Sequence, residues 1–541
     1  MDSRIDVRGW IQKHVHRGMV LATLFFCVGL PVISSQEDAL QRGLNALKES
    51  HFDQALEALT IAENEQPENP RIRNFRGIAL MQLGKTSDSE TEYREATRLD
   101  PKYEDAWRNL GVLLWTAHRL EPAREALLRA IALSPDDSFS HYYLGRVQLD
   151  SQQYAEAFRE LKLSGLQLPD DPAFLLQVAA GHVALGEAEE ARKVLRQLSA
   201  KNPIPAQTAQ AALLFVALHD YVQAIKLLKA ASQQEPYDDT AWAYCDLALV
   251  YLLSGNYEQA VPPSRIFVNL QQARKSGPVE TAAAWSLLGI AEARTGQSEA
   301  AIRELRQAAT VEPGNEQHWL NLTREMMEAG RYRDSIAATR EGIAANPKSY
   351  ALHLRLGAAQ LAAGQYKESE AAFRTLVDAG DPLPTSYVGL AQVLLREGRA
   401  EEAVSVLNAA EKKIGKSFLL SYFLGLSWDR AGKRQDAAKA FREAIKQNSQ
   451  SSEAHLGLGK AALALGQVDD AIAELQEALR LGPGNVQARR LLSQAYRRTG
   501  DTERAEEFAK ASSDKPPVPE GDLLGDFFLP QWQIPKQPHA N

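Results

Sequence analysis

The sequence predicts an all-α fold, a superhelical solenoid of stacked helix pairs, and three observations support it. Apolar residues recur at helical spacing along nearly the whole chain, and no stretch shows the alternation of a half-buried strand. Prolines recur at a constant step of 34 residues, at Pro67, Pro101, Pro135, Pro169 and Pro203. Finally, 541 residues are too many for one compact core, so several domains or a solenoid are expected.

Residues 282–315 show the repeating unit most clearly. Its marks, in order, are Trp285, Leu288, Gly289, Gly296, Ala301, Leu305, Ala308 and Pro313. The first three lie on one side of a first helix, and Gly296 interrupts the helical pattern. Ser298 is placed to cap a second helix, which Pro313 ends because proline has no N–H. Gly289 and Ala301 are small, so the two helices are expected to approach closely there, as at Gly111 and Ala123 in an earlier unit. Two such amphipathic helices cannot bury their apolar sides alone, so the unit is suited to stacking.

The order W-x-x-L-G, A-x-x-x-L-x-x-A and P resembles the tetratricopeptide repeat. The resemblance covers about residues 36–511, and it implies an all-α superhelical solenoid that binds proteins or peptides in a concave groove. We count about 14 units, which begin near Gln36, Pro70, Glu104, Ser138, Pro172, Pro205, Ala241, Ala282, Glu316, Tyr350, Pro384, Phe418, Ser452 and Val486.

Two consecutive prolines suggest a division of this array. Pro262 and Pro263 fall early in the expected second helix of the seventh unit, where they prevent regular helix or confine it to a start after Pro263. A polar stretch follows before the next clear unit. We therefore expect a first array at 36–271, a linker or hinge at 272–281 and a second array at 282–511.

The N-terminal residues 1–35 have the order of a secretory signal peptide. Basic residues precede an uncharged run at 18–33, and the small residues Ser34 and Ser35 follow it. A run of 16 residues is short for a membrane-spanning helix. We expect export to the periplasm or the extracellular space. The alternatives are a membrane anchor formed by 18–33 and a soluble cytoplasmic segment.

The C-terminal residues 512–541 form a proline-rich tail with an apolar segment around Phe527, Phe528 and Trp532. Two interpretations are open. The tail is a disordered end, or it contains a short segment that docks on this protein or on a partner.

Composition argues against several classes of function. The net charge of −8 does not favour a nucleic-acid partner, which normally requires a basic surface. Of the two cysteines, Cys27 lies in the N-terminal run, so a mature chain would hold Cys245 alone, without an internal disulfide or a Cys-based metal site. No cofactor, metal or small-molecule substrate is expected.

No catalytic constellation is predicted either. His141, His353 and His455 fall at the register position that Trp107, Trp285 and Trp319 hold in other units, which indicates packing in a helix. The segments outside the repeats are too short for a catalytic domain. We therefore expect a protein that is not an enzyme.

The resemblance implies that positions two, five, nine and twelve of each first helix tend to face the groove. In the first half, the candidate partner-binding residues at these positions are Asn74, Arg108, Trp115, Tyr142 and Arg146. Arginine beside exposed aromatic rings is typical of a binding hot spot, so these side chains are expected to face solvent. The alternative is that Trp115 and Tyr142 pack between adjacent first helices.

In the second half, the fifth position is apolar, which favours helix packing over binding. Its residues are Leu320, Leu354, Val388, Tyr422 and Leu456.

The predicted function is a non-enzymatic scaffold for protein–protein interaction, possessing a groove for peptide or protein partners. One alternative is a structural subunit of an envelope assembly, secretion or polysaccharide-export machine. Another is an enzyme, such as a transferase that carries such repeats, and the missing catalytic domain argues against it.

Overall fold

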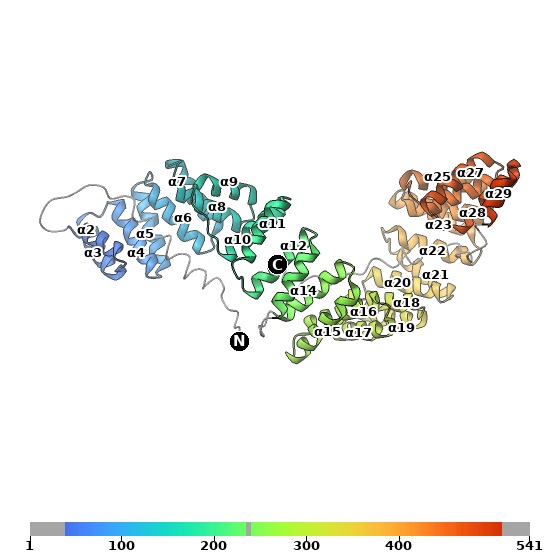
Figure 1. Cartoon of the computed structure of the whole chain (residues 1–541), viewed down its shortest axis with the longest axis horizontal. Coiled ribbons are helices and arrows are strands. Elements are labelled where there is room, and N and C mark those ends of the chain that lie inside the picture. Colours follow the sequence, from blue (N-terminus) through green and yellow to red (C-terminus); the bar gives the residue numbers. More distant parts are fainter. Residues whose placement is uncertain (1–37, 234–239, 511–541) are drawn as a thin grey trace. The chain divides into compact units, whose positions relative to one another are not determined.

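The computed structural model describes residues 38–233 and 240–510, and these two stretches contain 28 helices and no strand (Figure 1). The chain forms two compact units, divided in the sequence between Ala231 and Ser232. The all-α solenoid predicted from the sequence is confirmed.

The helices of the first unit, the last of which reaches one residue past the division, are α2 (Ala39–Lys48), α3 (Phe52–Glu65), α4 (Pro70–Gln82), α5 (Thr86–Leu99), α6 (Glu104–Thr116), α7 (Leu120–Leu133), α8 (Ser138–Asp150), α9 (Tyr154–Ser164), α10 (Pro172–Ala184), α11 (Ala188–Ser199), α12 (Pro205–Ala217) and α13 (Tyr221–Ser232).

Those of the second unit are α14 (Thr240–Leu253), α15 (Tyr257–Ala273), α16 (Pro278–Arg294), α17 (Ser298–Val311), α18 (Glu316–Glu328), α19 (Tyr332–Ala345), α20 (Tyr350–Ala362), α21 (Tyr366–Asp378), α22 (Pro384–Arg396), α23 (Ala400–Ile414), α24 (Phe418–Arg430), α25 (Arg434–Gln447), α26 (Ser452–Ala464), α27 (Val468–Leu481), α28 (Val486–Thr499) and α29 (Thr502–Lys510).

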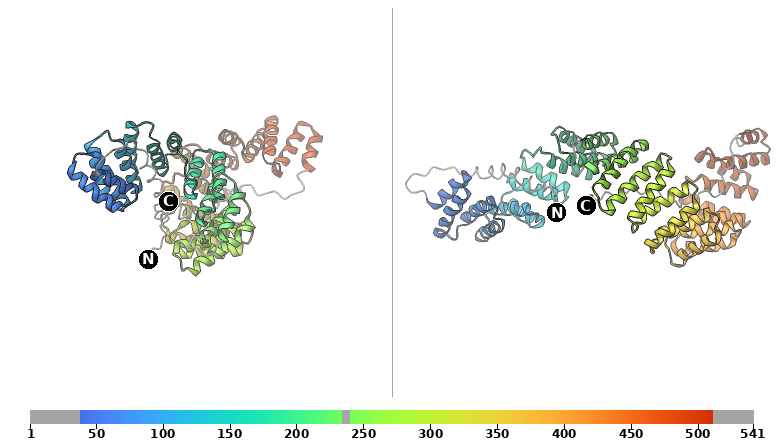
Figure 2. Two further views of the ribbon diagram at one scale, coloured as in Figure 1. Left: turned by 60° about the vertical axis from the view of Figure 1, so that its left-hand side comes forward. Right: turned by 90° about the horizontal axis from the view of Figure 1, so that it is seen from below.

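The even-numbered helices are the first helices of the predicted pairs, and all but three begin at the predicted residue. The exceptions are the starts expected at Gln36, Ala241 and Ala282, where the helices begin at Ala39, Thr240 and Pro278. Within each unit, first helices of neighbouring pairs contact one another, and second helices pack beside their own first helices, as α7 does beside α6 and α17 beside α16 (Figure 2). The first helices therefore form one layer of each unit, which we call the first-helix layer.

The turn inside each pair requires one residue with a left-handed backbone. Gly84 and Gly296 occupy this place with φ of 75° and 78°. Ser50, His118 and Gln152 occupy it in their own pairs with φ of 60°, 57° and 60°. Glycine adopts this conformation without the steric cost that a Cβ imposes, so the three other residues store local strain.

A second glycine position brings the two helices of a pair together. A Cβ on Gly111 would lie 2.6 Å from Cγ of Leu127 and 3.2 Å from the carbonyl oxygen of Ala123. A Cβ on Gly289 would meet Leu305 and Ala301 in the same way, at 2.7 and 3.1 Å. The predicted close approach at these glycines is confirmed.

The prediction that Ser298 caps its helix is wrong. Ser298 is the first residue of α17, and Gln297 is the residue at the N-cap, without a side-chain cap. The backbone N–H of Gln297 instead donates to the carbonyl of Glu292 across the turn at 2.9 Å. The tight turn thus sets the start of the helix, and no cap is needed there.

The prediction that Pro262 and Pro263 prevent regular helix is also wrong, because α15 runs through both of them. Each proline removes a backbone hydrogen bond, at a cost of about 3 kcal/mol in a helix interior. Residues that α15 buries contribute against this cost. One of them, Phe267, is fully buried, and its ring lies 5.3 Å from that of Trp242 on α14.

Of the expected hinge at 272–281, only residues 274–277 lie outside helices. The compact units divide at Ala231 instead. The assignment of separate arrays at 36–271 and 282–511 stays a prediction.

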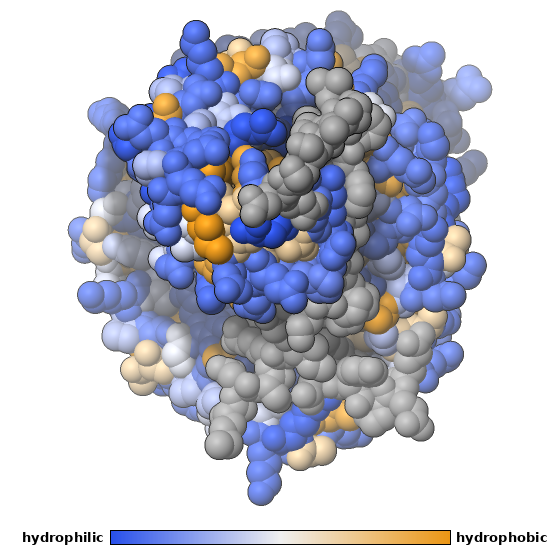
Figure 3. Space-filling model, turned by 90° about the vertical axis from the view of Figure 1, so that its left-hand side faces the viewer, coloured by the Kyte–Doolittle hydropathy of each residue, from blue (hydrophilic) through white to orange (hydrophobic). Residues whose placement is uncertain are grey.

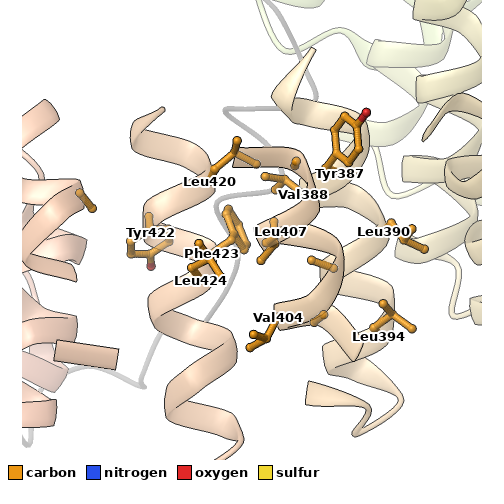
Figure 4. Packing of buried hydrophobic residues seen from close by; sticks show 14 of the residues in the cluster. Tyr387, Val388, Leu390, Leu394, Val404, Leu407, Leu420, Tyr422, Phe423 and Leu424 are labelled. Atoms are coloured by element: carbon orange, nitrogen blue, oxygen red, sulfur yellow. The ribbon is translucent and has the colours of Figure 1, made fainter. Parts of the chain in front are cut away.

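Large apolar side chains of neighbouring pairs interlock in the core. In Figure 4, Phe423 and Leu424 lie on the side of α24 that faces Leu407 and Val404 of α23. Val388 and Tyr422, from the apolar stripe of fifth positions, are buried in the same cluster, and Leu354 packs against it. Leu320 is buried, and Leu456 packs on a neighbouring cluster. The interpretation of this stripe as helix packing is confirmed.

Candidate partner-binding surface

The five residues predicted to bind a partner lie in the first-helix layer of the first unit. Asn74 is on α4, Arg108 and Trp115 are on α6, and Tyr142 and Arg146 are on α8. The expectation that they face solvent is wrong: Tyr142 is 1% exposed, Trp115 8% and Arg146 9%. The alternative, packing between adjacent first helices, is confirmed.

Asn74 and Arg108 hold equivalent positions and connect to the next pair in the same way. Nδ2 of Asn74 donates to the hydroxyl of Tyr103 at 3.2 Å, and Nη1 of Arg108 donates to the carboxylate of Asp137 at 3.0 Å. Both partners lie 29 residues further along the chain. Asn109 also donates to Oδ1 of Asn74 at 2.9 Å. These bonds tie each first helix to its neighbour.

The charge on Asp137 is stabilised at this contact. Burial raises the pKa of Asp137, but the guanidinium of Arg108 and hydrogen bonds from Ser140 outweigh it, so the pKa lies below its usual value. Arg108 also pairs with Asp105 on its own helix. The guanidinium is therefore occupied by two carboxylates of this chain.

Arg146 is surrounded by aromatic rings. Its guanidinium carbon lies 5.1 Å from the ring centre of Trp115, 5.9 Å from that of Tyr142 and 4.9 Å from that of Phe174. Its Nη1 donates to the hydroxyl of Tyr142 at 2.9 Å. Cation–π contacts of this kind are stabilising when they are desolvated. This cluster joins α6, α8 and α10, so its first role is to hold three pairs together.

The indole of Trp115 is fixed as well. Its Nε1 donates to the carboxylate of Asp150 at 2.6 Å, and Gln177 donates to the other oxygen at 3.0 Å. The partners of Asn74, Arg108 and Trp115 lie 29 or 35 residues away, about one repeat. A search for polar pairs at one repeat length could have revealed these bonds from the sequence.

The histidines that share a register position with tryptophan are packing residues, as predicted. Nε2 of His141 lies 2.8 Å from the carbonyl of Pro135, and Nε1 of Trp107 donates to the equivalent carbonyl of Pro101 at 3.1 Å. His141 also pairs with Glu160 through Nδ1 at 2.6 Å. Burial lowers the pKa of His141, but these two contacts outweigh it and leave the pKa raised.

Buried polar atoms without a hydrogen-bond partner share one place in the fold. Among the described residues, all such side-chain atoms belong to even-numbered helices. In the first unit they are on Arg73, Arg76, Arg108, Arg146 and Gln148, and in the second on Ser286, Glu292, His318, Arg355, Gln360, Thr385, Tyr387 and Gln392. In the part of the chain that the structure describes, unpartnered buried side-chain atoms therefore lie in the first-helix layer and on none of the second helices.

Arg355 on α20 is the one described residue with two such atoms, and no pattern in the sequence pointed to it. Two of its nitrogens, Nε and Nη1, are buried without a partner, and the residue is 3% exposed. Burial and the charge of Arg324 lower its pKa to about 10, so it is still protonated at neutral pH.

The surface seen in Figure 3 is largely hydrophilic, with hydrophobic residues in small separate groups. The most exposed large apolar side chains of the described residues, Val222 and Leu163, lie on the second helices α13 and α9. A broad apolar interface is therefore not the main feature of this surface.

Residues 38–233 and 240–510 contain no helix that is long and apolar enough to span a bilayer. The N-terminal run at 18–33 and the C-terminal tail lie outside the described residues. Within the described stretches, no three metal-ligating side chains gather into a site. Cys245 is buried, and burial raises the pKa of its thiol.

The fold and this layer define a class of protein, the helix-pair solenoid. Residues 40–104, 76–138, 108–164, 320–384, 360–417, 424–486 and 456–517 match the family described as tetratricopeptide repeat, and 241–262 match a second description of the same repeat. These segments cover more than half of the chain. The chain belongs to the tetratricopeptide repeat family.

Solved structures of similar proteins include the Cut9–Hcn1 hetero-tetramer of the APC/C, at 14% identity over 85% of this chain and 96% of that one, with a TM-score of 0.35. The structure of Naa15/Naa10 bound to HypK-THB has 14% sequence identity over 90% of this chain and 70% of that one, with a TM-score of 0.30. A thermophilic repeat protein of Thermus thermophilus has 24% sequence identity over 34% of this chain and 98% of that one, and its TM-score is also 0.30. We draw no function from these low scores.

Proposed function

We propose that this protein is a non-enzymatic scaffold that binds protein or peptide partners on its first-helix layer. Membership of the tetratricopeptide repeat family supports an interaction scaffold. The observation that carries the choice of surface is the confinement of unpartnered buried polar atoms, among the described residues, to the first helices. Such atoms are costly unless a hydrogen bond satisfies them, and a bound chain would supply those bonds.

The second unit offers this surface better than the first. In the first unit, Arg108 and Arg146 are held by acids or aromatic rings of the chain itself. In the second unit, unpartnered atoms continue from α16 to α22. We therefore place the partner on these four first helices rather than on the five residues chosen from the sequence.

The sequence of residues 1–35 supports a second part of the proposal. A basic segment, an uncharged run and small residues are the order of an export signal, so the scaffold would work in the periplasm or outside the cell. Anchoring of the chain to the membrane by 18–33 is the alternative.

The test uses two matched charge insertions in the full chain. Met327→Glu changes a partly exposed residue of the first helix α18, and Thr375→Glu changes an exposed residue of the second helix α21. Partners are captured from native envelopes, and the melting temperature of each variant is measured in parallel. We expect Met327→Glu to lose partners and Thr375→Glu to keep them, with both folds intact.

Equal capture by both variants would contradict binding on the first-helix layer. The stoichiometry of the captured complex separates two functions. A fixed stable complex would favour a structural subunit of an envelope machine, whereas exchange of several partners supports the scaffold.

A further inference from the structure

Arg355 is a buried cation without a counter-charge bonded to it. Its Nε and Nη1 have no hydrogen-bond partner, and the residue is 3% exposed. An uncompensated buried charge is strongly unfavourable, whereas a charge with a bonded partner of opposite sign is tolerated. An anion bonded to Arg355 would therefore stabilise this position.

The neighbouring helix α18 does not provide that anion. The charges that act on Arg355 are those of Arg324 and Glu328. Glu328 is already engaged, because Nε of Arg324 donates to its Oε1 at 2.8 Å. Glu328 thus bonds the guanidinium of Arg324 and not that of Arg355.

In the first unit, the residues at the equivalent two positions form a hydrogen bond with each other. Gln177 on α10 donates to Asp150 on α8 at 3.0 Å, across a separation of 27 residues. Arg355 and Glu328 have the same separation and the same register on their helices. The equivalent bond is formed in the first unit and is not formed by Arg355.

The chain carries a segment with the complementary chemistry. Between Pro516 and Pro535 the only charged residues are the acids Glu520, Asp522 and Asp526, and no basic residue interrupts them. They are interleaved with apolar residues, namely Leu523, Leu524, Phe527, Phe528 and Leu529. Acidic and apolar residues in alternation suit a site that combines guanidinium groups with a packed helical layer.

The segment is long enough to reach the site. Neighbouring packed helices lie about 10 Å apart, so the four steps from α28 to α20 amount to about 40 Å. The 16 residues from Lys510 to Asp526 span at most about 55 Å when extended. The tether also raises the effective concentration of the segment at the site.

We propose that Arg355 and Arg324 form a carboxylate-binding site in the first-helix layer, and that the chain's own acidic segment at residues 520–529 occupies it. This goes beyond the proposed function, because the ligand belongs to the same chain. A docked segment covers part of the layer on which partners bind, so partners must displace it.

The test keeps the full chain and neutralises the segment with Glu520→Gln, Asp522→Asn and Asp526→Asn. A fluorescein-labelled synthetic peptide of residues 516–535 is the probe, and fluorescence anisotropy measures its binding. We expect the neutralised chain to bind the peptide more tightly than the unaltered chain, in which the native segment competes.

Arg355→Met, made in the neutralised chain, should weaken peptide binding about tenfold or more, because a charge-assisted hydrogen bond is lost. Arg303→Met removes an exposed arginine of the second helix α17 and should leave binding unchanged. If Arg355→Met lowers the melting temperature, the comparison moves to a peptide with the same three neutral substitutions. That peptide should lose affinity for the neutralised chain by a similar factor.

Absence of peptide binding to the neutralised chain would overturn the proposal, as would equal affinity of the charged and neutral peptides. Capture of other proteins by the neutralised chain would in either case leave the proposed scaffold function standing. The failures of the two proposals are therefore distinguishable.

Discussion

Gly111→Ala adds a single methyl group at the closest approach of α6 and α7. The new Cβ would lie 2.6 Å from Cγ of Leu127, 3.0 Å from its Cδ2 and 3.2 Å from the carbonyl oxygen of Ala123. Ordinary carbon contacts are about 3.5–4.0 Å. Leu127 and Ala123 are both fully buried, so neither has free space into which to move.

Two effects of opposite sign decide the outcome. Alanine in a helix interior is favoured over glycine by about 1 kcal/mol. Overpacking of a buried contact typically costs about 1–3 kcal/mol, and here one of the contacting atoms belongs to the backbone. We expect a net loss of about 1 kcal/mol in the free energy of unfolding.

The assay is urea denaturation followed by circular dichroism, with hydrogen exchange to locate the effect. Because each repeat contacts only its neighbours, protection should fall in α6 and α7 and stay unchanged in the second unit. Gly314→Ala is the matched control, since a Cβ there meets no atom within 4 Å and should not destabilise the fold. Increased stability of Gly111→Ala would refute the packing argument.

Four further outcomes are expected. Gln152→Gly should raise the urea midpoint, because Gln152 holds φ of 60° at a turn where other pairs have glycine. Tyr142→Ala should cost roughly 3–5 kcal/mol by the same assay, as for other buried aromatic residues, and a solvent-facing Tyr142 would show no such loss. Burial raises the pKa of Asp246 to about 7. Its stabilising contribution is therefore complete below the unfolded pKa of about 4 and is lost as the pH rises through 7. Asp246→Asn should then raise the melting temperature relative to the unaltered protein at pH 8 but not at pH 4, and an equal effect at both would contradict the burial argument. N-terminal sequencing of protein from its native host should find Ser35 or Gln36 first, whereas Met1 would exclude a cleaved signal.

The sequence alone was sufficient to predict the helix pairs, all but three of the first-helix starts and the glycines between the helices. These features depend on residues a few positions apart in one helix or turn, where 3.6-residue periodicity, proline and glycine act locally. Gly111 could be placed at a close contact because its neighbours on the second helix, Ala123 and Leu127, follow within the same unit.

Tertiary structure decided the features that depend on the neighbouring repeat. Trp115 and Tyr142 occupy positions that can face a groove, but contacts with Asp150 and with Arg146 bury them. Likewise, α15 continues through Pro262 and Pro263, and the residues that it buries, Phe267 among them, contribute against the two lost backbone bonds. The missing counter-charge of Arg355 is set by the neighbouring helix α18, where Arg324 already engages Glu328. Burial and charge compensation are properties of the space between repeats, which helical periodicity within one repeat does not describe.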